Sequence, residues 1–170
     1  MARWVDRIRQ GLLALRPRPE PDEERFTRQW LTREQRAAFA SLSAHDRAHL
    51  VRVARTIARR APDQRDLIVA ALLHDLGKTD GRHHVRLVDR VIKVLLERGS
   101  PRLLHWLARP EPSRLRAGIA LAVHHPALGA ARAAELGCSD RVVWLIKHHE
   151  DSTIDDPELR LLADVDQATP

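Results

Sequence analysis

An adjacent His74 and Asp75 end an apolar run over residues 70–73, and Gly77 and Lys78 follow them closely. Burying a histidine beside an aspartate costs free energy unless something partners both side chains. Imidazole nitrogen and carboxylate oxygen both bind zinc, iron and manganese, and the two oxygens of Asp75 can bridge two ions. Lys78 adds a point charge suited to phosphate. The doublet therefore predicts a metal centre that works on a phosphate-containing molecule.

Other metal-binding residue types end or face further apolar segments of the chain. They are His49, His125, His148, His149 and Asp164. With His74-Asp75 and His148-His149 each taken as a pair, the gaps between successive groups run from 15 to 50 residues, and each has room for a helix and a turn. Helical bundles build metal sites from side chains that project inward from separate helices. We therefore expect these residues to converge.

The segments that carry these side chains have the apolar spacing of helices, and no segment alternates with the period of a strand. Ser or Thr precedes several of them, which is typical of helix N-caps. The expected N-caps are Thr32, Ser43, Ser113 and Ser139, and Asp156-Pro157 is expected to begin the last helix. The sequence thus predicts an all-α bundle.

Proline and glycine predict where several helices begin and end. Pro62 is expected to open the helix that carries His74 and Asp75, and residues 82–98 form the next long helical pattern. Gly77 is expected to close the first of these in the left-handed conformation. Pro126 is expected to separate two helices, one of which ends at His125.

The composition of the chain fits one globular domain with a sizeable core. Its 170 residues are 44% apolar, and no apolar run approaches the roughly 20 residues of a membrane span. Cys138 is the single cysteine, so an internal disulfide is excluded. With no secretory signal evident, we expect a cytoplasmic protein.

The charge of the chain is +6, and Arg supplies most of the basic residues. This balance would attract phosphate groups of a nucleotide, a nucleic acid or an anionic lipid. It is equally what a GC-rich genome would encode, so the partner stays open between these explanations.

The N-terminal region, residues 1–21, differs from the rest. Residues 3–15 predict a basic amphipathic helix, and residues 16–21 alternate Pro with charged residues and predict an extended linker. The helix is expected either to pack on the domain or a partner, or to lie on an anionic membrane. The domain proper is predicted to span residues 22–170.

The motifs resemble those of the HD superfamily of metal-dependent phosphohydrolases. The stretch from His74 to Lys78 reads HDLGK, His49 lies in HLVRVA, and Asp164 lies in a closing ADV. The HPALG stretch that begins at His125 and the HHE that begins at His148 are similar to the HD-GYP branch, but no GYP follows.

The resemblance implies an HD-domain helical bundle with a dinuclear centre that hydrolyses a nucleotide or phosphodiester. It implies ligand sets for two divalent ions and a phosphate contact from Lys78, with iron, manganese, zinc and nickel all open. One ion would be held by His49, His74, Asp75 and Asp164, and the other by Asp75, His125, His148 and His149. Asp75 and Lys78 would be the catalytic residues.

Two nearby acidic residues are given lesser roles, and three alternatives to the dinuclear hydrolase stay open. Asp166 is expected on the solvated side of the last helix, and Glu150 is expected to orient a ligand histidine. The alternatives are a mononuclear nucleotide phosphatase, a non-catalytic metal-binding sensor or scaffold, and a di-iron oxygenase. The oligomeric state is also left open.

Overall fold

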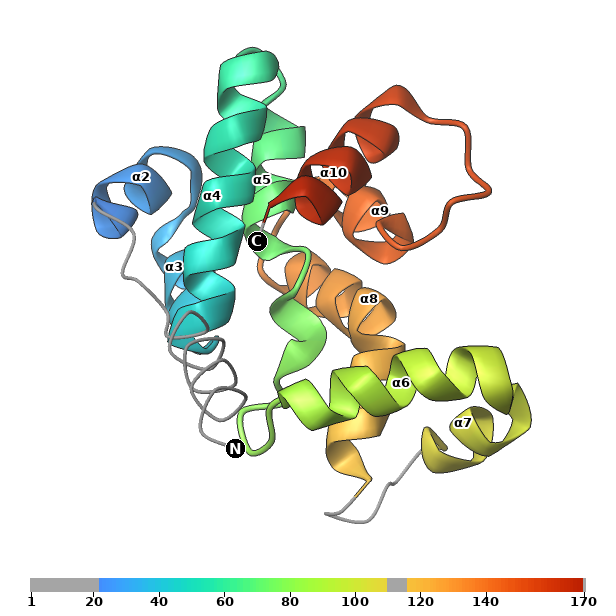
Figure 1. The fold of residues 1–170 in the computed structure, drawn as a ribbon. Coiled ribbons are helices and arrows are strands. Elements are labelled where there is room, and N and C mark those ends of the chain that lie inside the picture. Colours follow the sequence, from blue (N-terminus) through green and yellow to red (C-terminus); the bar gives the residue numbers. More distant parts are fainter. Residues whose placement is uncertain (1–21, 110–115, 170) are drawn as a thin grey trace, which may run out of the picture.

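The structure is a computed structural model that describes residues 22–109 and 116–169. Within these ranges every element of regular secondary structure longer than an isolated bridge is a helix (Figure 1). The all-α prediction is confirmed. The elements are α2 (Glu23–Trp30), α3 (Arg33–Ala40), α4 (Ala44–Arg60), α5 (Arg65–Leu73), the 3₁₀ turn η1 (Leu76–Lys78), α6 (Leu87–Gly99), α7 (Pro101–Leu107), α8 (Ala117–Glu135), α9 (Asp140–His148) and α10 (Pro157–Ala168). The predicted N-terminal helix and linker and the predicted cap at Ser113 lie outside the described residues.

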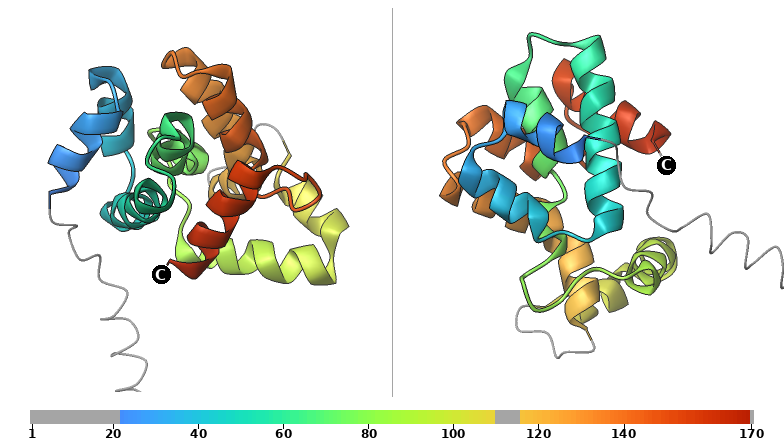
Figure 2. Two further views of the ribbon diagram at one scale, coloured as in Figure 1. Left: turned by 90° about the horizontal axis from the view of Figure 1, so that it is seen from above. Right: turned by 90° about the vertical axis from the view of Figure 1, so that its left-hand side faces the viewer.

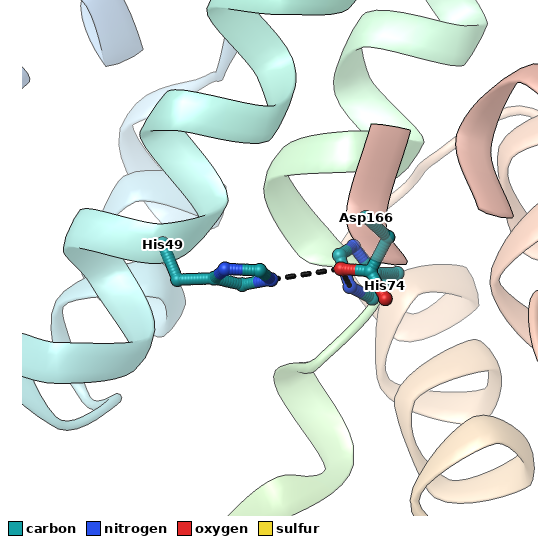
Figure 3. A group of neighbouring side chains, drawn as sticks. All are labelled: His49, His74 and Asp166. Carbon is teal, nitrogen blue, oxygen red and sulfur yellow. Dashed lines mark hydrogen bonds and ion pairs between the residues drawn. The ribbon is translucent and has the colours of Figure 1, made fainter. Parts of the chain in front are cut away.

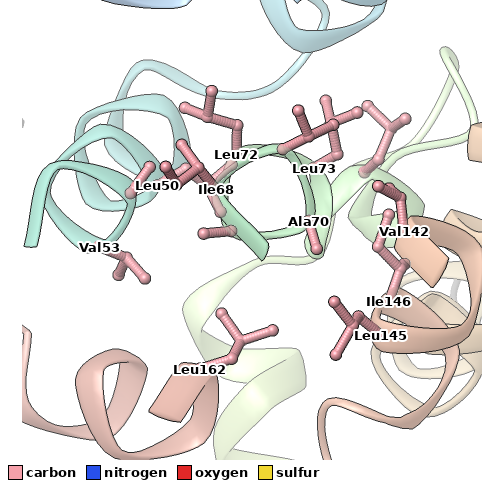
Figure 4. Close-up of a cluster of buried hydrophobic side chains, with 14 of the residues drawn as sticks. Leu50, Val53, Ile68, Ala70, Leu72, Leu73, Val142, Leu145, Ile146 and Leu162 are labelled. Atoms are coloured by element: carbon pink, nitrogen blue, oxygen red, sulfur yellow. The ribbon is translucent and has the colours of Figure 1, made fainter. Parts of the chain in front are cut away.

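Helix α5 is the centre of the bundle. All residues from Leu67 to Leu73 are buried, which is typical of a helix surrounded by others. Figure 4 shows Leu50 of α4, Leu145 of α9 and Leu162 of α10 packed around it. Because α5 ends inside this core, the residues that follow it, His74 and Asp75, are placed at the centre of the molecule.

The predicted helix N-caps in the described ranges are confirmed. The Thr32 side chain forms a capping box with Gln35, and the Ser43 and Ser139 hydroxyls accept hydrogen bonds from backbone N–H groups three residues on. The Asp156 carboxylate likewise accepts from the N–H of Leu159 at 2.9 Å. Such caps are local, so the sequence alone specifies them.

Helix α5 begins and ends differently from the prediction. It starts at Arg65 rather than Pro62, and Gly77 is not left-handed; among the described glycines only Gly81 and Gly137 have positive φ. Gly77 lies in η1 against α8, and a Cβ there would be 2.2 Å from the carbonyl oxygen of His125. Because glycine has no side chain at this position, η1 can pack closely on α8.

The prediction of two helices separated by Pro126 is wrong, because α8 continues through this residue. Pro126 has no N–H to donate to the carbonyl of Ala122, one turn earlier. The Nδ1 of His125 lies 3.0 Å from that carbonyl oxygen and donates to it instead. A side chain thus satisfies the freed carbonyl, and packing against η1 and α9 holds the helix together.

Helices α6 and α7 form an arm on one side of the bundle. Helix α6 packs on α8, and α7 packs on α6, while the core around α5 lies on the other side of α8 (Figures 1 and 2). Helix α6 begins at Leu87, later than the predicted residue 82. Among the helices of the described ranges, none combines the length and apolar character needed to cross a membrane.

Candidate metal centre

One carboxylate oxygen at the centre of the bundle lacks a hydrogen-bond partner. Asp75 is buried, and its Oδ1 has no partner among the described residues. This oxygen lies 3.7 Å from the Nε2 of His74 and 3.7 Å from the Nε2 of His125. The other oxygen, Oδ2, accepts a hydrogen bond from the Nζ of Lys78 at 2.5 Å. A buried carboxylate oxygen left between two imidazoles is costly, and a cation would satisfy it.

Three residues from three separate helical elements meet around His74, the sequence neighbour of Asp75, and Figure 3 shows them. The Oδ1 of Asp166, from α10, lies 2.7 Å from the Nε2 of His49, from α4. The same oxygen lies 3.2 Å from the Nε2 of His74 at the end of α5. We call His49, His74 and Asp166 the Asp166 end of the site.

A second group, which reaches Asp75 through His125 and His149, consists of His125, His149 and Glu150, and we call it the Glu150 end. One ligand atom from each lies within 4.8 Å of the others. The Nε2 atoms of the two histidines are 3.3 Å apart, and the Glu150 Oε1 is 3.7 Å from the Nε2 of His125. Glu150 also accepts hydrogen bonds from the Nζ of Lys93 at 2.9 and 3.0 Å.

The two ends are continuous. His74, Asp75 and His149 also offer ligand atoms within 4.8 Å of one another, so His74 is shared with the Asp166 end and His149 with the Glu150 end. Figure 3 shows only the Asp166 end, whose residues the prediction had partly missed. The potential ligands thus form one unbroken row across the bundle.

Backbone carbonyls orient three of the histidines in the same way. The Nδ1 atoms of His74, His125 and His149 lie 3.1, 3.0 and 2.7 Å from the carbonyl oxygen three residues earlier. A carbonyl can only accept, so each Nδ1 carries the proton and donates it. In the neutral rings of His125 and His149, each Nε2 is then left with its lone pair directed into the site, which is the tautomer that binds a metal; the Nε2 of His74 must first lose the proton that it donates to Asp166.

The charges around the site put most of its residues in the state that metal binding requires. Burial lowers the pKa of His125 and of His149 to about 4, so both are neutral at pH 7. Burial opposes ionisation of Asp75, but Lys78 and His74 outweigh it and hold the pKa of that carboxyl well below its usual range. Hydrogen bonds from His49 and His74 likewise outweigh burial and lower the pKa of Asp166.

His74 is the exception to this pattern. Burial disfavours its charged form, but the nearby carboxylates of Asp75 and Asp166 outweigh burial and raise its pKa. The excess of negative charge around this imidazole attracts a cation, and a metal ion would compete for it with the proton.

A cavity of about 670 Å³ opens beside the row of ligands. Its walls come from η1, α6, α10 and the segment between α9 and α10. Lys78, Lys93 and Arg160 contribute positive charge to it. Seven carboxylates also line it, and these are Asp75, Glu97, Glu150, Asp151, Asp155, Asp164 and Asp166. This volume is typical of pockets for small ligands.

The structure brings together five of the seven predicted ligands, and these are His49, His74, Asp75, His125 and His149. It does not bring His148 or Asp164 into these groups. The ring of His148 lies 5.0 Å from the ring of Trp144, and Asp164 is an exposed residue at the cavity wall. Lys78, predicted to contact phosphate, lines the cavity and pairs with Asp75.

Two acidic residues contribute more directly to the site than the sequence suggested. The expectation that Asp166 lies on the solvated side of α10 is wrong, because its carboxylate contacts His49 and His74. Glu150, expected only to orient a histidine, offers its carboxylate directly to the Glu150 end.

The apolar spacing of the helices contains the signal that identifies the missed residues. In α10, Leu159 and Leu162 are buried, and Asp166 follows them by seven and four residues, so it continues their stripe. Asp164 follows by five and two residues and falls off it. In α9, His149 continues the buried stripe of Val142 and Leu145 in the same way, whereas His148 does not.

A helical bundle with histidines and carboxylates gathered at its centre defines an all-α protein with the equipment to bind metal. The sequence profile of the HD domain matches residues 47–169, and the chain belongs to this family. The match includes every residue of both ends of the site. HD domains are helical, bind divalent metals and belong to a superfamily of metal-dependent phosphohydrolases. No curated protein and no solved structure matched the chain.

Proposed function

We propose that the protein hydrolyses a phosphoester, in a nucleotide or a phosphodiester, at a centre of two divalent metal ions. The observation that carries this proposal is the Oδ1 of Asp75, which is buried, has no hydrogen-bond partner in the described part of the chain, and is equally distant from the Nε2 atoms of His74 and His125. An oxygen placed between the two ends of the site is suited to bridge one ion at each end.

The two ends supply separate ligand sets. His49, His74 and Asp166 would hold one ion and His125, His149 and Glu150 the other, with Asp75 between them. When bound, such ions lower the pKa of a water and neutralise phosphoryl oxygens, which is the chemistry of phosphoester hydrolysis. The three carboxylates balance most of the charge of two divalent ions, and the remainder favours an anionic substrate.

Lysines and an arginine of the cavity complete the proposal. Lys78 holds the second oxygen of Asp75 and so fixes the orientation of the carboxylate. Lys93 and Arg160 line the cavity, where Lys93 pairs with Glu150 and Arg160 with Asp155, and phosphate groups that lie further from the ions would compete with these carboxylates for the two cations. The cavity volume of about 670 Å³ accommodates a nucleotide-sized molecule.

A single-ion phosphatase is the second candidate, and one contrast favours it. Asp166 already contacts both histidines of its end, whereas Glu150 is paired with Lys93. If the Glu150–Lys93 ion pair persists, only the Asp166 end has a carboxylate that is available to bind an ion. Metal stoichiometry separates the two candidates.

The test combines metal analysis with turnover. The protein is stripped with a chelator, reloaded separately with manganese, iron, zinc or nickel, and assayed against aryl phosphates, aryl phosphodiesters, nucleotides and cyclic dinucleotides. We expect two ions per chain, turnover of at least one class, and loss of turnover in Asp75→Asn. A fully loaded protein with no turnover of any class would contradict the proposal and favour a non-catalytic role.

A further inference from the structure

Helix α6 turns its apolar side chains outward. Val88, Val91, Val94 and Leu95 are 53, 48, 47 and 66% exposed, whereas Asp89, on the opposite side of the helix, is 2% exposed. An amphipathic helix of a globular protein normally has the reverse arrangement. Helix α7 extends the apolar surface. We call Val88, Val91, Val94 and Leu95 of α6, with Leu103 and Trp106 of α7, the outer face.

Specific contacts fix α6 in this orientation. The Asp89 carboxylate accepts hydrogen bonds from the N–H and the Nε of Arg86, which caps the helix N-terminus. It is packed so closely on α8 that a Cβ at Gly118 would lie 2.2 Å from its Oδ2. On its cavity side, Lys93 pairs with Glu150. The packing of the opposite side of α6 against α8 and the ion pair with Glu150 therefore keep the outer face directed away from the bundle.

The segment that contains the arm, residues 82–109, carries most of the net charge. Residues 82–109 contain seven Arg or Lys and two Asp or Glu, a balance of +5 within a chain of net charge +6. Arg98, Arg102 and Arg109 are exposed and form no ion pair with any residue in the described ranges. The apolar surface is thus bordered by exposed cations that form no ion pair within the described ranges.

We propose that the outer face docks on the surface of an anionic lipid bilayer. The charge complements acidic headgroups, and exposed Val and Leu side chains gain free energy only where they leave water. Trp and Arg suit the boundary between headgroups and acyl chains, because each has an apolar body and a polar tip.

Other occupants fit the same surface less well. A second copy of the chain would bring two segments of charge +5 together, which like-charge repulsion opposes. A nucleic acid would contact the arginines but would gain little from the exposed aliphatic stripe. A bilayer uses both features at once.

Docking would also orient the cavity. Lys93 and Glu97 line the cavity, while Val91 and Leu95 lie on the outer face of the same helix. With α6 against the bilayer, the cavity lies directly behind it and close to the headgroups.

The test uses the full chain and vesicles of phosphatidylcholine, with or without phosphatidylglycerol. We expect co-sedimentation with the anionic vesicles only, weakened by salt. The pair Arg98→Glu and Arg102→Glu should reduce the partition coefficient about tenfold or more, since each basic residue near an anionic surface contributes roughly fivefold. The pair Val91→Ser and Leu95→Ser tests the apolar contribution and should also reduce it.

The matched control is the pair Arg59→Glu and Arg60→Glu, which makes the same charge change on exposed residues at the end of α4. It should keep most of the binding, and circular dichroism should show that all variants fold. Equal loss in the control would overturn the proposal, as would absence of vesicle binding by the unmodified chain. Full binding by both the arginine pair variant and the Val91-Leu95 pair variant would overturn the proposal and assign the membrane contact to residues 1–21. If the same variants kept vesicle binding but lost self-association, the outer face would be assigned to a second copy of the chain. If they lost binding to duplex DNA instead, the face would be assigned to nucleic acid.

Discussion

The Asp166 end and the Glu150 end of the site use similar residues but differ in how far they are assembled. At the Asp166 end, one carboxylate oxygen contacts two imidazoles that come from α4 and from the end of α5. At the Glu150 end, two imidazoles face each other at 3.3 Å, and the carboxylate is bound to Lys93 of α6.

This difference predicts an order of metal binding. The Asp166 end already directs a carboxylate to the place where an ion would lie, and the charge there raises the pKa of His74. At the Glu150 end, the charge of the Glu150 carboxylate is neutralised by Lys93. An ion that binds there must break this ion pair, which costs free energy. We expect the Asp166 end to fill first and Asp75 to link the two.

The largest effect is expected from Asp75→Asn, because this change affects both ends at once. It keeps the shape of the side chain but removes the charge that would offset two cations. We expect metal content to fall at both ends and turnover to fall at least about 100-fold, beyond what loss of an indirect partner costs. Metal analysis and steady-state kinetics measure the two losses. Full metal content and full turnover in this variant would show that Asp75 is not a bridge.

The next effect separates two aspartates of α10. Asp166→Asn should weaken the ion of the Asp166 end at least about tenfold and leave the Glu150 end able to bind. Asp164→Asn changes the same residue type two positions away, on an exposed part of the helix, and should leave metal affinity nearly unchanged. Chelator competition measures both affinities. The opposite ranking would restore Asp164 as the ligand that the sequence motif suggested.

Gly77→Ala tests the contact that brings the ends together. A methyl group there would meet the His125 carbonyl at 2.2 Å, so η1 and α8 must move apart. We expect a loss of stability of about 1–3 kcal/mol and weaker metal binding at the Glu150 end. Gly99→Ala is the control, because nothing lies within 4 Å of its added Cβ. Equal behaviour of the two variants in thermal unfolding would mean that the close approach is not needed.

These predictions show which parts of the molecule are encoded locally. The caps at Thr32, Ser43 and Ser139 depend on residues three positions away, so the sequence predicts them. The role of Gly77 depends on α8, some fifty residues later, and local rules gave it a left-handed conformation that it does not adopt. Pro126 was misjudged because the rule for proline does not include a neighbouring histidine that satisfies the freed carbonyl.

For the site, the sequence predicted correctly which helices come together. It was less successful in predicting which side of each helix faces the site. Successive residues of a helix point about 100° apart, so a motif that is one or two positions off selects a different side of the helix. This is why Asp164 was expected where the structure has Asp166, and why His148 was expected to bind alongside His149 although only His149 joins the group. The pairing of Glu150 with Lys93 joins two distant helical segments and has no local pattern in the sequence.

Acid should affect the metal-free protein through the Glu150 end. The pKa of His125 and of His149 is about 4 in the folded state, below the usual value near 6.5. Between these values the unfolded chain binds more protons, so stability should fall as pH decreases from about 6.5 to 4. Thermal unfolding in the presence of a chelator measures this fall. Replacing His125 by Asn should flatten the slope, and an unchanged slope would mean that other groups cause it.

The smallest effect is expected from Lys93→Met. This change removes the partner that holds Glu150 and also removes a positive charge near the ion. We expect the Glu150 end to bind its ion more tightly, by about fivefold at most, because a partly exposed ion pair contributes little. Glu97 also lies near Lys93, so Glu97→Gln serves as a control for the change in local charge. Weaker binding in Lys93→Met would show that the lysine supports the site.

The most direct test of the central claim is a crystal structure of the manganese-loaded protein with anomalous diffraction at the metal edge. The account predicts two peaks about 4 Å apart, on either side of Asp75, with one near His49 and Asp166 and the other near His125 and His149. A single peak at saturating manganese, or two peaks that Asp75 does not separate, would contradict it.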